Sequence, residues 1–196
     1  MSRSRGRPDG KTLLFSVAKG SSYAVAALSL TDKKVTPVGG IQSPFPPSAT
    51  FSPDGRWVAY SATVPGPPGG SLFVQPFPAT GATYPISKGT GSHPVWSPDG
   101  KELFYFTGGG RFGQAVAVSV RTQPTFTFGN PVPGPSGFFG RGLSGERNYD
   151  ITRDGKRFLG VVPAGQSASG APAAPQIQVV LNWFEELRRL APTGRR

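Results

Sequence analysis

The sequence of 196 residues has no cysteine and a single histidine, His93. Without cysteine the chain cannot form disulfides, thiolate metal sites or a cysteine nucleophile, and one histidine leaves no partner for a histidine-rich metal cluster. No apolar run approaches the roughly 20 residues that a membrane-spanning helix needs, and no apolar stretch of a signal peptide follows the basic N-terminus. We therefore expect no metal, no cofactor and no membrane span in this chain.

Acidic residues are also scarce, and the net charge is +11. The excess is concentrated in two basic tails, residues 1–6 with their neighbour Arg7 and residues 192–196 with the preceding Arg188 and Arg189. Removing the seven arginines at the two ends takes the 21 basic residues to 14 against 10 acidic ones, a net charge of +4. Arginine-rich ends are more often solvated extensions than phosphate-binding arms, so a nucleic-acid partner is not expected.

Glycine and proline are abundant, with 28 and 22 residues, and aromatic residues make up 11% of the chain. This combination favours a fold of many short strands and turns over low complexity. Four segments repeat the same pattern: RPDGKTLLFSV, SPDGRWVAYSA, SPDGKELFYFT and TRDGKRFLGVV. Their Asp-Gly pairs, at spacings of 45, 45 and 55 residues, are Asp9-Gly10, Asp54-Gly55, Asp99-Gly100 and Asp154-Gly155.

The repeat length lies in the range of β-propeller blades, and the extra ten residues of the last spacing fall in the glycine-rich segment 134–145. Proline favours the first corner of a turn, aspartate bonds its own downstream backbone, and glycine adopts a positive φ without strain. The Asp-Gly pairs are therefore predicted to be structural turns. The runs that follow them, such as Trp57–Tyr60 and Leu103–Phe106, are apolar at successive positions. Strands of this kind are expected to be covered on both faces.

These patterns predict an all-β fold, a partial β-propeller of about four blades, each a four-stranded antiparallel sheet with the first and last incomplete. The blades are expected at about 7–40, 48–88, 93–133 and 148–182, within a repeat region 7–181. The predicted strands are Lys11–Val17, Ser22–Leu30, Lys34–Val38, Ser48–Ser52, Arg56–Ala62, Ser71–Phe77, Ala82–Ser87, His93–Ser97, Lys101–Thr107, Gln114–Val120, Thr125–Val132, Asn148–Thr152, Lys156–Val162 and Gln176–Leu181.

The two ends of the repeat region do not complete one another. Repeats two to four carry an apolar residue three positions before the key aspartate, whereas the first has Gly6 there. The first blade thus lacks its first strand and the fourth its last, so the ring does not close. Because open sheet edges pair with other chains, we expect a homodimer, or further blades that complete the ring in a longer protein.

A short amphipathic helix is predicted at residues 182–191. Asn182 is suited to its N-cap, with Glu185 three residues on, and Pro192 follows its end. Its apolar face must dock, because so short a helix is unstable alone in water. It either seals the end of the fourth blade or binds a partner, with the residues Trp183, Phe184, Leu187 and Leu190.

The Ser-Pro-Asp-Gly-basic pattern resembles the WD40-like repeat of TolB-type β-propellers over about Gly6 to Leu181. The strongest copies are SATFSPDGRWVAYSA and PVWSPDGKELFYF. The ending IQVVLNWFEELRRL is similar to the C-terminus of propeller regions that follow serine/threonine kinase domains in some bacteria. The resemblance implies a protein-interaction or sensor propeller with a protein or peptide partner. The chain is expected in the cytoplasm as written, or in the periplasm within a larger envelope protein.

No catalytic set is visible. The G-x-G-x-x-G match at 108–113 precedes a strand instead of a helix and is predicted to be a hairpin loop. His93 begins a predicted inner strand without a visible nucleophile beside it. We therefore expect no enzymatic activity from this chain alone, and two functions stay open. One is a non-catalytic binding, scaffold or sensor propeller; the other is an accessory propeller of a kinase or peptidase whose catalytic domain lies elsewhere.

Overall fold

A computed structural model describes residues 6–63, 70–107, 114–134 and 147–160 of the chain. It separates a unit Met1–Val161 from a unit Val162–Arg196, and all described residues belong to the first. These residues form strands and turns and contain no helix, so the expectation of an all-β fold is confirmed. The predicted helix at 182–191, the strand Gln176–Leu181 and the glycine motif at 108–113 lie outside the described residues.

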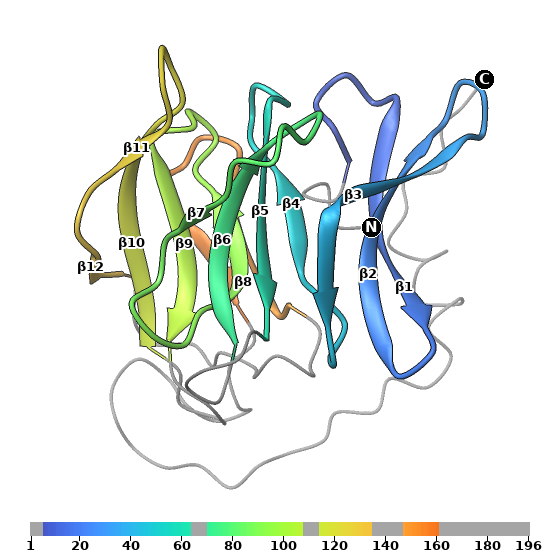
Figure 1. The fold of residues 1–196 in the computed structure, drawn as a ribbon. Coiled ribbons are helices and arrows are strands. Elements are labelled where there is room, and N and C mark those ends of the chain that lie inside the picture. The colour runs from blue at the N-terminus through green and yellow to red at the C-terminus, as the bar shows by residue number, and fades with distance from the viewer. Residues whose placement is uncertain (1–5, 64–69, 108–113, 135–146, 161–196) are drawn as a thin grey trace, which may run out of the picture. The chain divides into compact units, whose positions relative to one another are not determined.

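The first two sheets are antiparallel and follow the order of the chain (Figure 1). Sheet 1 consists of β1 (Thr12–Lys19), β2 (Ser22–Ser29) and β3 (Val35–Ser43). Sheet 2 consists of β4 (Ala49–Phe51), β5 (Trp57–Ala62), β6 (Ser71–Pro76) and β7 (Tyr84–Pro85).

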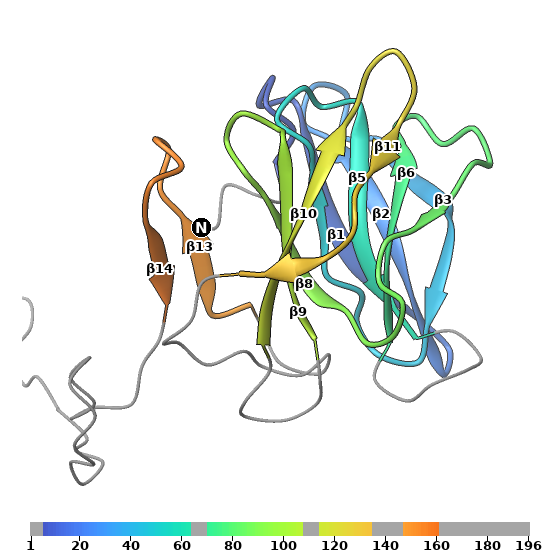
Figure 2. The same ribbon diagram turned by 90° about the vertical axis from the view of Figure 1, so that its left-hand side faces the viewer.

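The next two sheets also place consecutive strands side by side, with one exception in sheet 3, where the last strand pairs with the third. Sheet 3 contains β8 (Ser92–Trp96), β9 (Glu102–Thr107), β10 (Gln114–Arg121), β11 (Thr127–Phe128) and β12 (Val132–Pro133). Sheet 4 contains β13 (Tyr149–Ile151) and β14 (Phe158–Gly160) and lies beside β8 and β9 (Figure 2). Each strand pair within the four sheets is antiparallel, as tight turns between consecutive strands require.

Three details differ from the sequence-based prediction. β3 runs on to Ser43, because Gly39 and Gly40 adopt φ of 60° and 67° and accommodate a register shift against β2. The predicted strand Thr125–Val132 is instead two short strands, β11 and β12, separated by Gly129 and Pro131. The first repeat, predicted to lack its first strand, keeps a single bridge between Gly6 and Leu13.

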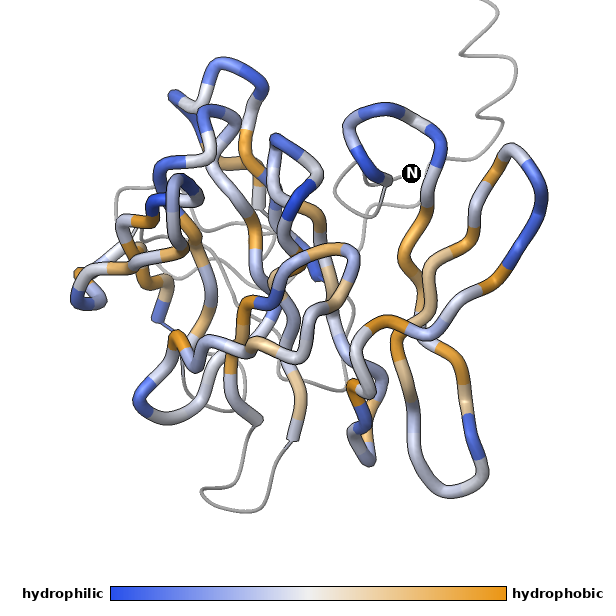
Figure 3. Tube along the Cα trace, turned by 45° about the horizontal axis from the view of Figure 1, so that its top comes forward, coloured by the Kyte–Doolittle hydropathy of each residue, from blue (hydrophilic) through white to orange (hydrophobic). Residues whose placement is uncertain are grey.

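The core lies between the faces of consecutive sheets. One apolar cluster joins sheets 1 and 2, a second joins sheets 2 and 3, and a smaller third joins sheets 3 and 4. Figure 3 shows the corresponding pattern along the chain, with hydrophobic residues in the strands and hydrophilic ones in the connecting turns. The sheets therefore stabilise one another by burying their flat faces.

The middle strands β5 and β9 are buried on both faces, as the apolar runs of the sequence indicate. On β5, Val58 belongs to the cluster shared with sheet 1, and the next residue, Ala59, to the cluster shared with sheet 3. On β9, Leu103 faces sheet 2, while Phe104 packs edge-on against Phe158 of sheet 4, with ring centroids 4.8 Å apart. The alternation of side chains along a strand thus connects three sheets through one strand.

Replacing Leu103 by alanine tests this packing. The side chain is 0% exposed between two sheets, so Leu103→Ala is expected to lower the free energy of unfolding by about 2–5 kcal/mol. Val132→Ala, at a position that is 54% exposed, is the control and is expected to change it by less than about 0.5 kcal/mol. Urea denaturation followed by tryptophan fluorescence measures both. Equal effects of the two substitutions would contradict burial between the sheets.

Candidate functional site

The four Asp-Gly pairs all lie in turns of one geometry. In each, the glycine N–H donates to the carbonyl of the residue three positions earlier at 2.9 Å, and the glycine φ is 68° to 70°. The aspartate Oδ1 accepts the N–H of the basic residue two positions later, at 2.9 to 3.1 Å. Only glycine takes this φ without strain, which explains why the pair recurs. These residues are Asp9, Gly10, Asp54, Gly55, Asp99, Gly100, Asp154 and Gly155.

A hydroxyl residue two positions before the aspartate closes three of the turns. Ser97 Oγ donates to Asp99 Oδ1 at 2.6 Å and accepts the N–H of Glu102 at 2.9 Å. Ser52 and Thr152 make the same two bonds in the second and fourth turns. Each hydroxyl thus joins the turn to the first residues of the following strand.

Hydrogen bonding keeps two of these carboxylates ionised. The Ser97 hydroxyl, followed by the backbone N–H of Lys101, lowers the pKa of Asp99. The Thr152 hydroxyl, followed by the N–H of Lys156, lowers the pKa of Asp154 in the same way. Both carboxylates are therefore negative over the physiological range and are acceptors, not proton donors.

Successive turns lie against one another. A Cβ atom built on Gly100 would lie 3.7 Å from Pro53 of the preceding turn, and one built on Gly155 would lie 3.5 Å from Pro98. Between the first two turns the space is tighter, and a Cβ atom built on Gly55 would lie 3.0 Å from Arg7 Nε. The turns thus form a row along one side of the stacked sheets, and we call it the turn row.

Arg7 fills the space between the first and second turns. Its Nε donates to the carbonyl of Gly55 at 3.2 Å, and its Nη1 pairs with Asp9 at 3.2 Å. Its guanidinium also lies 5.6 Å from the ring centroid of Phe77. Arg7 occupies the repeat position of Ser52 and Ser97, so in this turn a cation takes the place of the hydroxyl.

Between the third and fourth turns the corresponding space is an open groove. Its walls include Asp99 and Glu102 on one side and Arg153 and Asp154 on the other. Asp99 also pairs with the exposed Lys101 at 3.7 Å. We call this space the turn groove; three carboxylates and one guanidinium line it, which suits a basic or hydrogen-bonding group of a partner.

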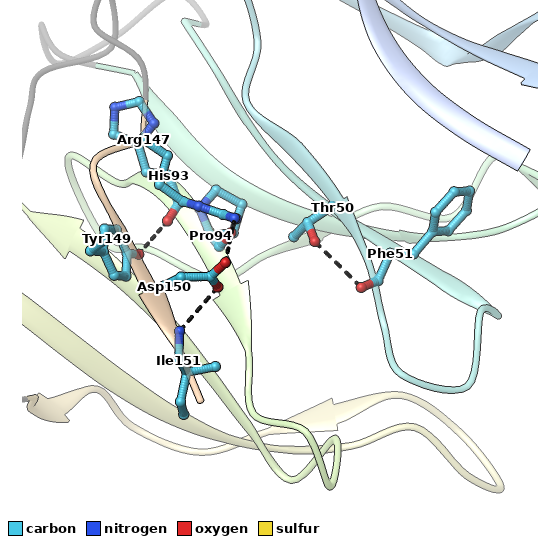
Figure 4. A network of polar contacts seen from close by, with 8 residues as sticks. All are labelled: Thr50, Phe51, His93, Pro94, Arg147, Tyr149, Asp150 and Ile151. Carbon is cyan, nitrogen blue, oxygen red and sulfur yellow. Dashed lines mark hydrogen bonds and ion pairs between the residues drawn. The ribbon is translucent and has the colours of Figure 1, made fainter. Parts of the chain in front are cut away.

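A second polar feature joins the inner strands β8 and β13 (Figure 4). The Tyr149 hydroxyl donates to the carbonyl of His93, and Arg147 Nη1 donates to the carbonyl of Pro94 at 3.4 Å. Arg147 Nη2 also pairs with Asp150 at 3.5 Å. Burial raises the pKa of Tyr149, so its hydroxyl keeps its proton and acts as a donor. The network ties sheet 3 to sheet 4.

His93 lies buried at an irregularity of strand β8. It is 2% exposed, its φ is 53°, and it lies where β8 shifts register against β9. Histidine is among the residues that tolerate this φ, and the bulge presents its carbonyl to Tyr149. The sequence singled out His93 but not Arg147 or Tyr149, because their partners lie 53 and 56 residues away without a recurring motif.

Two structural findings bear on other kinds of site. Within the described ranges, no group of three or more His, Cys, Asp or Glu residues is arranged to hold a metal ion. In the same part of the chain no helix is long and apolar enough to span a membrane. The helix residues Trp183, Phe184, Leu187 and Leu190, predicted to dock or to bind a partner, lie outside it.

Comparison with known proteins finds similarity to fungal peptidases, while no family model matches. The chain is 33% identical over 93 residues to dipeptidyl-peptidase 5 of Aspergillus fumigatus, a match over 37% of this chain and 13% of that protein. It is 28% identical over 156 residues to a probable dipeptidyl-peptidase 5 of Aspergillus flavus, over 68% of this chain and 21% of the relative. The chain therefore spans about a fifth or less of these relatives.

Solved structures resemble the fold. TolB from Acinetobacter baumannii matches with a TM-score of 0.53 and 18% identity, over 81% of this chain and 43% of that one. Hydrazine synthase from Kuenenia stuttgartiensis matches with a TM-score of 0.50 and 14% identity, over 78% and 47%. These neighbours support the propeller-like fold that the repeat indicates.

The pH dependence of stability tests the hydrogen bond between Ser97 and Asp99 in the third turn. The unfolded-state pKa of Asp99 is near 3.8 and the folded-state pKa is lower, so its stabilising effect is present above about pH 3.8 and is lost as pH falls through the folded-state pKa. Ser97→Ala removes the largest cause of this shift and is expected to lower the free energy of unfolding near neutral pH. Urea denaturation measures the free energy of unfolding at about pH 6 and about pH 2.5. Between these two pH values it should fall less for the variant than for the wild type. Parallel profiles would contradict the role of Ser97.

Proposed function

We propose that the chain is a non-catalytic binding segment, a partial β-propeller of about four blades that acts as a scaffold or sensor for a protein or peptide partner. The observation that carries this proposal is the turn groove. Arg7 places a guanidinium between the first two turns, against a carbonyl at 3.2 Å and a carboxylate at 3.2 Å. In the turn groove the repeat position of Arg7 is Ser97, and the one guanidinium of the lining, Arg153, comes from the fourth turn.

The chemistry of the groove favours a basic side chain of the partner. Asp99 and Asp154 are held ionised by their turns, and Glu102 adds a third carboxylate on the same lining. The exposure of these groups makes each ion pair weak on its own. Useful affinity therefore requires a partner that also contacts neighbouring turns, which suits a peptide or a protein loop better than a small cation.

Selection of peptides on the purified chain tests this function. A library of displayed random peptides is selected on the wild type, and synthetic copies are measured by fluorescence polarisation. Glu102→Lys reverses one charge of the groove and is expected to weaken binding of selected basic peptides by at least about tenfold. Asp32→Lys, at an exposed turn between β2 and β3, is the control and should leave binding within about twofold.

Two results would count against the proposal. Failure to enrich any peptide that binds in solution would remove the evidence for this binding role. Equal losses from Glu102→Lys and Asp32→Lys would indicate that the peptides respond to overall charge and not to the groove.

The similarity to dipeptidyl-peptidase 5 favours a second candidate function, an accessory propeller of an enzyme. In this case the chain belongs beside a catalytic domain, a peptidase by this similarity or a kinase by the resemblance of its C-terminal sequence. The matched part is at most about a fifth of the relatives. Both candidates leave this chain without a reaction of its own, and they differ in what it is joined to.

An activity assay checks the expectation common to both candidate functions, that this chain alone catalyses no reaction. The purified chain is expected to release no p-nitroaniline from dipeptidyl p-nitroanilides above the rate of buffer. Turnover that follows the protein through two different purification steps and disappears on heat unfolding would contradict a non-catalytic role.

A further inference from the structure

One face of sheet 1 is apolar and open. Leu14 of β1 is 2% exposed in the cluster shared with sheet 2, so Leu13, Phe15 and Val17 lie on the opposite face. Leu13 and Val17 are each 37% exposed. Directly paired residues of β2 and β3 extend this face, which we call the open face; these residues are Ala24, Leu28 and Val35, together with Ala26, which is itself only 6% exposed.

In sheets 2 and 3, the face that corresponds to the open face of sheet 1 is covered by the preceding sheet. The fourth and sixth residues after the key aspartate are Val58 and Tyr60 in sheet 2, and they are 0% and 7% exposed because sheet 1 covers them. In sheet 3 these positions are Leu103 and Tyr105, covered by sheet 2 and 0% and 2% exposed. The corresponding Leu13 and Phe15 have the same character, yet no described sheet lies against them.

The covering sheet contributes the fifth residue after its own aspartate. Leu14 does so between sheets 1 and 2, Ala59 between sheets 2 and 3, and Phe104 between sheets 3 and 4. In sheet 4 the fifth residue is Leu159, which is 61% exposed. The described residues thus contain two uncovered faces: the face of sheet 1 with the fourth and sixth residues, and the face of sheet 4 with the fifth residue. Faces of these two types pack together at the three junctions between consecutive sheets.

The turn row repeats this complementarity. A Cβ atom built on Gly55, Gly100 or Gly155 would lie within 4 Å of the preceding turn, whereas one built on Gly10 would meet nothing within 4 Å. The fourth turn carries Arg153 where the others have proline. If the fourth turn lay against the first turn of another copy, it would bring this cation beside the turn that contains Asp9.

We propose that the open face binds sheet 4 of a second copy of this chain, head to tail, with Leu159 against Leu13 and Val17. The described residues of two copies provide eight sheets, the upper end of the 4 to 8 blades of closed propellers, and two identical joints cover both free faces of these residues at once. Asp150 lies opposite Leu159 on the same side of sheet 4, and its pairing with Arg147 at 3.5 Å offsets its charge at the joint. The proposal names one partner within the protein-binding role above and uses a face distinct from the turn groove.

Sedimentation equilibrium of the 196-residue chain is the experiment. The wild type is expected to be a dimer, and two variants are expected to be monomers. The first variant, Leu13→Asp with Val17→Asp, introduces charge only into the open face. The second variant, Leu159→Asp, introduces charge only into the outer face of sheet 4. Val132→Asp introduces the same charge at a valine that is 54% exposed away from both faces, so it should remain a dimer.

Mixing the two monomeric variants tests whether the intact face of one variant binds the intact face of the other. Each retains the face that the other lacks, so an equimolar mixture should form a dimer through one joint, at least about tenfold weaker than the wild type. Far-UV circular dichroism and the thermal midpoint confirm that each variant is folded. Recovery on mixing cannot arise from unfolded variants or from non-specific association.

Three outcomes would overturn the proposal. They are a monomeric wild type at about 100 µM, a mixture that stays monomeric, and a Leu159→Asp variant that remains a dimer. A monomeric wild type would indicate that the chain's own residues 161–196 or an unrelated protein cover the open face. Peptide binding is measured separately with Glu102→Lys. Peptide binding without dimers would overturn the dimer proposal alone. Dimers without peptide binding would overturn only the proposed function of the turn groove.

Discussion

The structure depends on strands that are apolar on both faces. A strand such as β9 directs Leu103 and Phe104 to opposite sides, so one neighbouring sheet leaves half of its apolar surface in water. Each sheet therefore needs two neighbours, and sheets accumulate in series. A series has two ends, and its end faces stay uncovered unless it closes. Open faces thus follow directly from the pattern that stabilises the interior.

The Asp-Gly turn determines which face meets which neighbour. In all four repeats the residue three before the aspartate pairs with the residue four after it, as in Phe51 with Val58 and Trp96 with Leu103. Even the first repeat keeps this pairing, between Gly6 and Leu13. A slip of one residue would turn every apolar side chain to the other face, so the glycine φ and the hydroxyl bonds of the turn hold the register of the whole stack.

Local patterns predicted the local features of this chain. The Asp-Gly pairs indicated the turns, and the apolar runs indicated buried strands such as β5 and β9. Features that depend on distant residues left no such pattern. The bond from Tyr149 to His93 spans 56 residues, and Arg7 reaches Gly55 across 48. The break between β11 and β12 depends on a proline and a glycine, but the composition around them fits one strand or two.

The same physics bears on what the chain can do. A general acid or base works best with a pKa near the working pH. Hydrogen bonds lower the pKa of Asp99 and Asp154, and burial raises the pKa of Tyr149, so these groups move away from neutrality. His93 is 2% exposed and contributes its backbone carbonyl to a structural link. The turns that hold the two aspartates in one charge state also order the sheets, which is why the proposed binding role is placed at the turns.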